Sequence, residues 1–112
     1  MAGRRQARRP QLWRLYVIRT VDNCLYTGVT TDVRRRFAEH QSGGPRAARY
    51  LRAHRPAAIV FSRVVGTRSH ALKVEYRFKQ LTRKQKERVV AMGHIPGSGL
   101  TQGHTRRAGA GA

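Results

Sequence analysis

The acidic residue best placed to do chemistry in this sequence is Glu75, one of only five acids in 112 residues. It falls four residues after Ala71 and three before Phe78, on or beside the apolar stripe of an expected helix. A carboxylate there is costly unless it is paired or holds a cation. Two interpretations follow: an ion pair with one of the many arginines, or a ligand for Mg²⁺ or Mn²⁺, which take carboxylate oxygens.

Arg36 and His40 lie four residues apart, a spacing that puts both on one face of a helix. One interpretation is a solvated basic face with His40 at the negative end of the helix dipole. In the other interpretation, Arg36 binds a phosphate with two nitrogens of its guanidinium and stabilises the negative charge that develops there during reaction. His40, one turn away, would then donate to a phosphate oxygen or relay a proton.

Tyr16 and Tyr26 are weaker signals, because a tyrosine in a strand usually belongs to the core. Together they say more, since a short hairpin brings both rings to one face. Gly28 beside them leaves room for backbone or a ligand to approach closely.

The elements that position these residues begin with a hairpin. Residues 12–20 and 24–29 are rich in β-branched and aromatic side chains, which predicts two strands. Asp22 and Asn23 form a turn signal between them. The strands therefore pair as an antiparallel hairpin.

A helix is predicted over 33–41, with Asp32 as its N-cap and 42–45 as its end. Its position after the hairpin places Arg36 and His40 near the two tyrosines in sequence. The basic segment 46–53 that follows is either a short helix or a loop.

Residues 57–65 predict a third strand, and a helix capped by Ser69 is expected over 70–81. A last helix is predicted from a capping box at 82–85 to Met92. The buried stripe of the first of these helices has the expected spacing of three and four residues: Ala71, Val74, Phe78 and Leu81.

This order of elements predicts an α+β domain over 12–92, a small antiparallel sheet flanked by helices. Residues 1–11 are rich in arginine and residues 93–112 are rich in glycine, and neither has a core-forming pattern. We expect a disordered basic arm and a disordered tail.

The charge of the chain points to a polyanionic partner. The formal net charge is +19, and residues 15–92 alone carry 17 basic against five acidic side chains, a net +12. Nucleic acid is favoured over an anionic membrane surface. The single cysteine excludes an internal disulfide and a cysteine-based zinc domain, and the short, arginine-broken apolar run 12–18 excludes an export signal or membrane span. We expect a cytoplasmic protein.

The chain resembles the GIY-YIG nuclease superfamily, and within it the small single-domain bacterial YhbQ-like proteins. The resemblance covers about residues 12–91. It rests on five elements in order: Leu15-Tyr16, Tyr26-Thr27-Gly28, Arg36, His40 and Glu75. It also rests on the two runs YTGVTTDVRRRFAEH and ALKVEYRFKQLTRKQKERVV.

The resemblance implies a three-stranded antiparallel sheet with flanking helices and a phosphodiesterase site that depends on Mg²⁺ or Mn²⁺. Tyr16 and Tyr26 match the motif tyrosines, Arg36 the catalytic arginine, His40 the helix histidine and Glu75 the metal ligand. We favour Tyr26 as the general base for the attacking water. Nearby cations would have to lower its pKa or strengthen its hydrogen bond to water, because a phenol with a pKa near 10 is a poor base at neutral pH.

The chain departs from the family pattern in three places. Arg14 stands for the first motif's glycine and Thr27 for the second motif's isoleucine, and neither carries chemistry. The late asparagine of many members is missing, since Asn23 is the only asparagine and lies in the turn.

The leading hypothesis is therefore an endonuclease that hydrolyses DNA phosphodiester bonds, in the repair or processing setting that the family implies. The alternatives are a weakly active or inactive nucleic-acid-binding module on the same scaffold, and, ranked last, an RNA- or ribosome-associated protein. DNA is the expected partner, with RNA as an alternative and no obligate protein partner. Six basic residues are expected to contact nucleic acid: Arg34, Arg35, Arg46, Arg49, Arg52 and Lys73.

Overall fold

The computed structural model describes residues 11–93. The expected arm 1–11 and tail 93–112 lie outside this range except for one residue each. The described chain forms these elements in order: β1 (Trp13–Thr20), β2 (Leu25–Thr30), α1 (Val33–Ser42), α2 (Arg49–Ala53), β3 (Pro56–Gly66), α3 (Arg68–Lys79) and α4 (Arg83–Met92).

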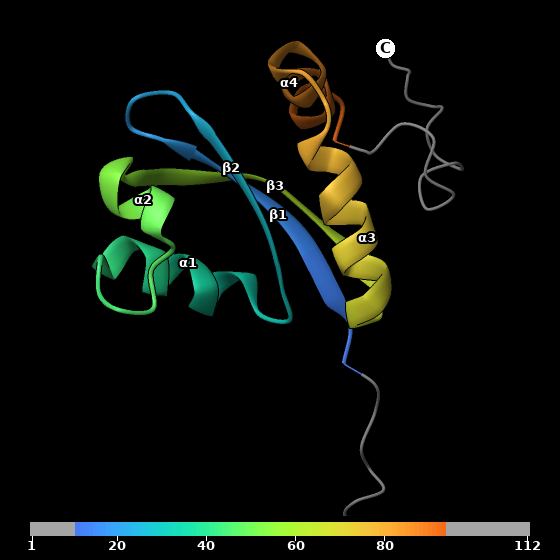
Figure 1. Cartoon of the computed structure of the whole chain (residues 1–112), viewed down its shortest axis with the longest axis horizontal. Coiled ribbons are helices and arrows are strands. Elements are labelled where there is room, and N and C mark those ends of the chain that lie inside the picture. The colour runs from blue at the N-terminus through green and yellow to red at the C-terminus, as the bar shows by residue number, and fades with distance from the viewer. Residues whose placement is uncertain (1–10, 94–112) are drawn as a thin grey trace, which may run out of the picture.

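The three strands form one antiparallel sheet in the order β2-β1-β3 (Figure 1). The hairpin β1–β2 turns at Asp22 and Asn23, and Asn23 adopts φ 66°, a left-handed conformation that asparagine tolerates. β3 crosses to the free side of β1. The predicted sheet of three antiparallel strands is confirmed.

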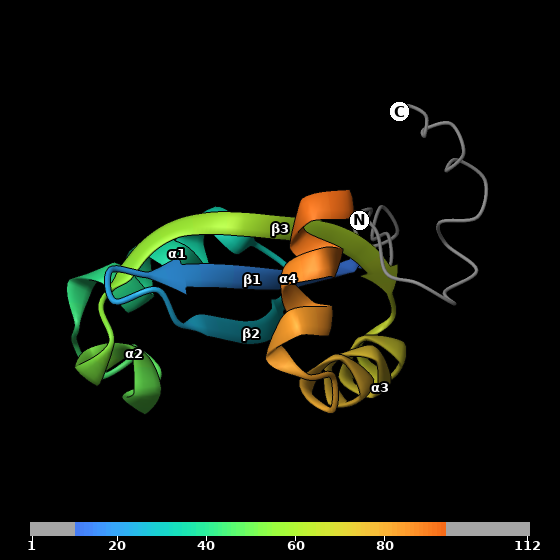
Figure 2. The same ribbon diagram turned by 90° about the horizontal axis from the view of Figure 1, so that it is seen from above.

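The central strand β1 is buried on both faces, because its alternate side chains enter two separate cores. Leu15 and Val17 pack with residues of α3 and α4, while Tyr16 and Ile18 pack with Leu51 of α2 and with residues of α1. Figure 1 shows the two pairs of helices on opposite sides of the sheet, and Figure 2 shows the same layers from above. Burial on both faces explains why β1 has a continuous apolar run rather than an alternating pattern.

Local chemistry fixes the helix ends. The Asp32 side chain accepts from the backbone N–H of Arg35 at 3.0 Å, and Gly43 ends α1 in the left-handed conformation, as predicted. α4 has the expected capping box, in which Thr82 and Gln85 each bond the other's backbone N–H.

Most element ends lie within one residue of the prediction, but both ends of one helix differ by two residues. The helix expected over 70–81 is α3, which begins at Arg68 because Thr67, rather than Ser69, accepts from the N–H of His70. α3 ends at Lys79, although Leu81 still packs on the core from the link to α4. The undecided segment 46–53 contains the short helix α2.

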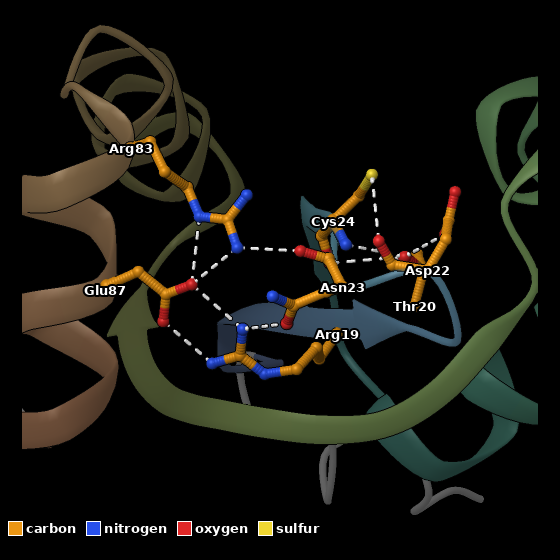
Figure 3. A network of polar contacts seen from close by, with 7 residues as sticks. All are labelled: Arg19, Thr20, Asp22, Asn23, Cys24, Arg83 and Glu87. Atoms are coloured by element: carbon orange, nitrogen blue, oxygen red, sulfur yellow. Dashed lines mark hydrogen bonds and ion pairs between the residues drawn. The ribbon is translucent and has the colours of Figure 1, made fainter.

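An ion-pair network ties α4 to the hairpin (Figure 3). Arg19 donates to both carboxylate oxygens of Glu87 at 2.9 and 2.8 Å, and Arg83 donates to Glu87 and to the Asn23 carbonyl oxygen. This network joins the start and end of the domain. None of the helices among residues 11–93 is both long and apolar enough to cross a membrane.

Candidate active site

Tyr16 reaches the edge strand β2 by lying across Gly28. The two residues are register partners on adjacent strands, and a Cβ at position 28 would lie 2.5 Å from the Tyr16 hydroxyl oxygen. Only glycine fits under this ring. The space expected at Gly28 is therefore filled by the ring of Tyr16. The absence of a side chain at Gly28 lets the Tyr16 hydroxyl reach the edge strand of the sheet.

His40 fixes the Tyr16 hydroxyl from behind. The backbone N–H of Ala48 donates to His40 Nδ1 at 3.1 Å, so the proton of the neutral ring is on Nε2. Nε2 then donates to the Tyr16 hydroxyl oxygen at 2.9 Å. Burial, aided by the charge of Arg36, lowers the pKa of His40 to about 4, which keeps the ring neutral.

This geometry does not support the hypothesis that His40 donates to a phosphate or relays a proton. The residue is fully buried, and each ring nitrogen has a protein partner. A proton passed to Nδ1 would meet a backbone amide, which cannot accept it. His40 is placed to position Tyr16.

The Tyr16 hydroxyl is left as a hydrogen-bond donor. Burial raises its pKa above the usual value, the charges of Tyr26 and Glu75 add to the rise, and Arg36 opposes it. The phenol therefore keeps its proton at neutral pH. Because the oxygen already accepts from His40, the proton is free to point toward a bound group.

Tyr26 lies on the same face of the hairpin, with its ring centroid 6.4 Å from that of Tyr16. It lines an open cleft of about 270 Å³ to which both α3 and α4 contribute a lysine. The cleft is lined by Leu25, Tyr26, Thr27, Tyr50, Lys79 and Lys86. It joins a phenol to two cations, a combination suited to an anionic ligand.

Arg36 stands beside this pair of tyrosines. Its Nη1 donates to a Glu39 carboxylate oxygen at 2.8 Å and to the Arg46 carbonyl oxygen at 2.7 Å, so the side chain is held in place. Burial would lower its pKa, but the bond to Glu39 and the neighbouring Tyr16 raise it. One terminal nitrogen is thus committed to the protein, and the guanidinium stays charged.

Glu75 of α3 is half-buried, with 19% of its side chain exposed. Its negative charge contributes to the raised pKa of Tyr16. Its ion-pair partner is Lys79, at 3.2 Å, rather than an arginine. An i, i+4 pair on a helix, here with an exposed lysine, contributes only about 0.3–0.5 kcal/mol. The carboxylate is therefore held loosely and can exchange its partner for a cation.

The six basic residues expected to contact nucleic acid are all exposed, but they do not share one hollow. Arg34 lines a depression with Arg14 and Ser62, and Lys73 lines a shallow surface of α3 with Tyr76. The remaining ones lie in α1 or in the segment around α2: Arg35, Arg46, Arg49 and Arg52.

Sequence reasoning missed the three side chains that complete the cleft, Tyr50, Lys79 and Lys86. Tyr50 stacks on Tyr26, with ring centroids 6.0 Å apart. The spacing of four residues from Glu75 could have flagged Lys79. Tyr50 and Lys86 carry no such local signal, because tertiary packing alone brings them to β2.

Known proteins resemble this chain over most of its described length. The family model described as the GIY-YIG catalytic domain matches residues 12–88. A UPF0213 protein of Enterobacter sp. (strain 638) is 60% identical over 79 residues, covering 70% of this chain and 76% of that protein. The UPF0213 protein YhbQ of Escherichia coli (strain K12) is 59% identical over 81 residues, covering 72% and 79%.

A solved structure is also similar. The solution NMR structure of the UPF0213 protein BH0048 from Bacillus halodurans is 33% identical and covers 84% of this chain and 98% of that one, with a TM-score of 0.48. The chain belongs to the GIY-YIG family, a nuclease superfamily, as a small YhbQ-like protein.

Proposed function

We propose that this protein is a divalent-metal-dependent endonuclease that hydrolyses DNA phosphodiester bonds, in DNA repair or processing. The observation that carries the proposal is the position of Glu75, a loosely paired carboxylate beside Tyr16. The other four acids have structural partners: Asp22 with His54, Asp32 as an N-cap, Glu39 with Arg36, and Glu87 with Arg19 and Arg83.

The residues around Glu75 fit a hard cation such as Mg²⁺ or Mn²⁺. Glu75 would hold it through a carboxylate oxygen, with water and phosphate oxygens as further ligands. When bound, the cation supplies charge stabilisation at the phosphate. Lys79 is then free to turn toward the anionic ligand in the cleft.

The chain's own residues divide the remaining work. Tyr16, which keeps its proton, donates a hydrogen bond to a phosphate or water oxygen. Tyr26 would act as its phenolate, having released its own proton to solvent, and would accept the proton of the attacking water. The charge of Arg36 stabilises negative charge that develops on the phosphate oxygens. His40 acts through Tyr16 and positions it.

The basic surface supports binding of the polyanion. Exposed arginines of α1 and α2 would contact phosphates away from the cleft and release counterions. The residues that would make these contacts are Arg34 and Arg35 of α1, Arg46 in the link to α2, Arg49 and Arg52 of α2, and Lys73 of α3.

The test is cleavage of plasmid, single-stranded and branched DNA, with RNA in parallel, in the presence of Mg²⁺ or Mn²⁺. Glu75→Gln should lower the rate at least about 100-fold, as loss of a metal ligand requires. Tyr26→Phe should abolish proton transfer and Tyr16→Phe should weaken the reaction. Asp32→Asn is the matched control, because it removes a carboxylate outside the site yet keeps the helix cap.

The alternative is a nucleic-acid-binding module that cuts little or not at all. The basic body favours it, as does the commitment of one Arg36 nitrogen to protein acceptors. It predicts affinity that falls steeply with salt, is unchanged by Glu75→Gln, and yields no products at long times. Equal background cleavage by wild type and Glu75→Gln would refute the endonuclease proposal.

A further inference from the structure

Three potential metal ligands of different chemistry meet at the turn of the hairpin, away from Glu75. They are Asp22, Cys24 and His54, whose ligand atoms all lie within 4.8 Å of one another. His54 Nδ1 is 2.7 Å from Asp22 Oδ2 and 3.9 Å from Cys24 Sγ. We propose that these side chains form a second metal site, for Zn²⁺ or a similar transition-metal cation.

The donor set selects the class of metal. A thiolate, an imidazole and a carboxylate suit Zn²⁺ or Co²⁺, whereas Mg²⁺ and Ca²⁺ prefer oxygen ligands alone. Three protein ligands leave the fourth tetrahedral position to water. The site therefore differs in kind from the all-oxygen site proposed at Glu75.

The distances fit such a site with little movement. Bond lengths of about 2.0–2.3 Å place the ligand atoms of a tetrahedral zinc roughly 3.3–3.8 Å apart. Cys24 Sγ and His54 Nδ1 are already near that separation, and the shared proton between Asp22 and His54 holds those two closer. The metal takes the place of this proton, which leaves to solvent together with the thiol proton, and the neutral ring of His54 then carries its proton on Nε2.

Thr20 orients two of the ligands from behind. Thr20 is 2% exposed, and its hydroxyl donates to Asp22 Oδ1 at 2.6 Å and accepts from the backbone N–H of Cys24 at 2.8 Å. Figure 3 shows Asp22 and Cys24 side by side on the turn above Thr20. Outer partners of this sort fix the direction of metal ligands.

His54 is held from the other side. It stacks on Tyr50 with ring centroids 4.4 Å apart, and the adjacent Arg55 carbonyl oxygen accepts from the N–H of Val21 at 2.8 Å. Tyr50 in turn stacks on Tyr26. A metal at this site would clip the hairpin turn to the end of α2 and hold one wall of the Tyr26 cleft.

The test uses the full chain and Co²⁺ as a spectroscopic probe, with Zn²⁺ as competitor. Because Cys24 is the only cysteine, a thiolate-to-cobalt charge-transfer band reports this residue alone. We expect the band at one Co²⁺ per chain, displacement by Zn²⁺, and its loss in Cys24→Ser. Asp22→Asn and His54→Gln should each weaken affinity more than Thr20→Val, for which about 10–100-fold is expected.

His70→Gln, at an exposed position of α3, is the matched histidine control and should leave the band unchanged. Glu75→Gln should also leave it unchanged, which separates this site from the proposed endonuclease centre. Circular dichroism of each variant without metal checks the fold. A band that survives both Asp22→Asn and His54→Gln, or one metal shared by two chains, would overturn the proposal, as would no band at millimolar Co²⁺.

Discussion

His40 Nε2 donates to the Tyr16 hydroxyl oxygen across 2.9 Å inside the domain. The direction of this bond follows from the Ala48 N–H, which occupies the other ring nitrogen. Tyr16 is thereby oriented by a residue that cannot itself touch substrate. In the proposed reaction, Tyr16 would meet the ligand and His40 would fix the position of its hydroxyl.

Replacing His40 tests this separation. His40→Ala removes the donor to Tyr16 and leaves the Ala48 N–H and a cavity, so we expect a loss of about 2–4 kcal/mol in the free energy of unfolding. His40→Gln keeps a donor and an acceptor and should retain more stability. Denaturant unfolding measures both, and equal losses in the two variants would contradict the expectation that a donor and an acceptor at position 40 stabilise the fold.

The depressed pKa of His40 predicts a pH dependence of stability. In the unfolded chain the imidazole takes up a proton near its ordinary pKa of 6.5, but in the folded protein only near 4. Stability is therefore complete above pH 6.5 and falls as the pH drops toward 4, by about 3 kcal/mol from this group. Thermal or denaturant unfolding at several pH values checks this pH dependence. His40→Gln is the reference, because its side chain does not titrate and its stability should lack the loss due to His40.

Gly28 should not tolerate a side chain. In Gly28→Ala the new Cβ would lie 2.5 Å from the Tyr16 hydroxyl oxygen, so the ring must move, at a cost of about 1–3 kcal/mol. Gly44→Ala is the control, because its Cβ would meet only the Ser42 hydroxyl at 3.5 Å. Comparable stability of the two variants in urea unfolding would contradict the close approach of Tyr16.

Glu87 and Glu75 should differ in what they do for stability. Glu87→Gln weakens the bonds to Arg19 and Arg83 that hold α4 to the hairpin, and we expect a loss of roughly 1 kcal/mol that shrinks with added salt. Glu75→Gln breaks only a single ion pair, to the exposed Lys79, and should change stability by less than about 0.5 kcal/mol. Chemical denaturation at low and high salt distinguishes them, and a larger loss for Glu75→Gln would place it among the structural acids.

Most of the scaffold can be predicted from local sequence patterns. Turn chemistry, the N-cap at Asp32 and the capping box at Thr82 can be predicted because they depend on neighbours within four residues. The two hairpin strands can be predicted from their β-branched and aromatic content on either side of that turn. The family resemblance is also confirmed, because it rests on motifs that can be identified from their order along the chain. The start of α3 was misplaced by two residues because Thr67 and Ser69 are both competent caps.

Which side chains meet at the candidate site depends on tertiary packing and cannot be predicted from local patterns. His40 could have faced solvent or substrate from its place in the helix, and it is the packing of α1 on β1 that buries it behind Tyr16. Lys86 joins Tyr26 and Lys79, and His54 joins Cys24, across gaps that no local pattern encodes. Contacts of this kind depend on how helices dock on the sheet, which is a property of the whole core rather than of any one stretch of sequence.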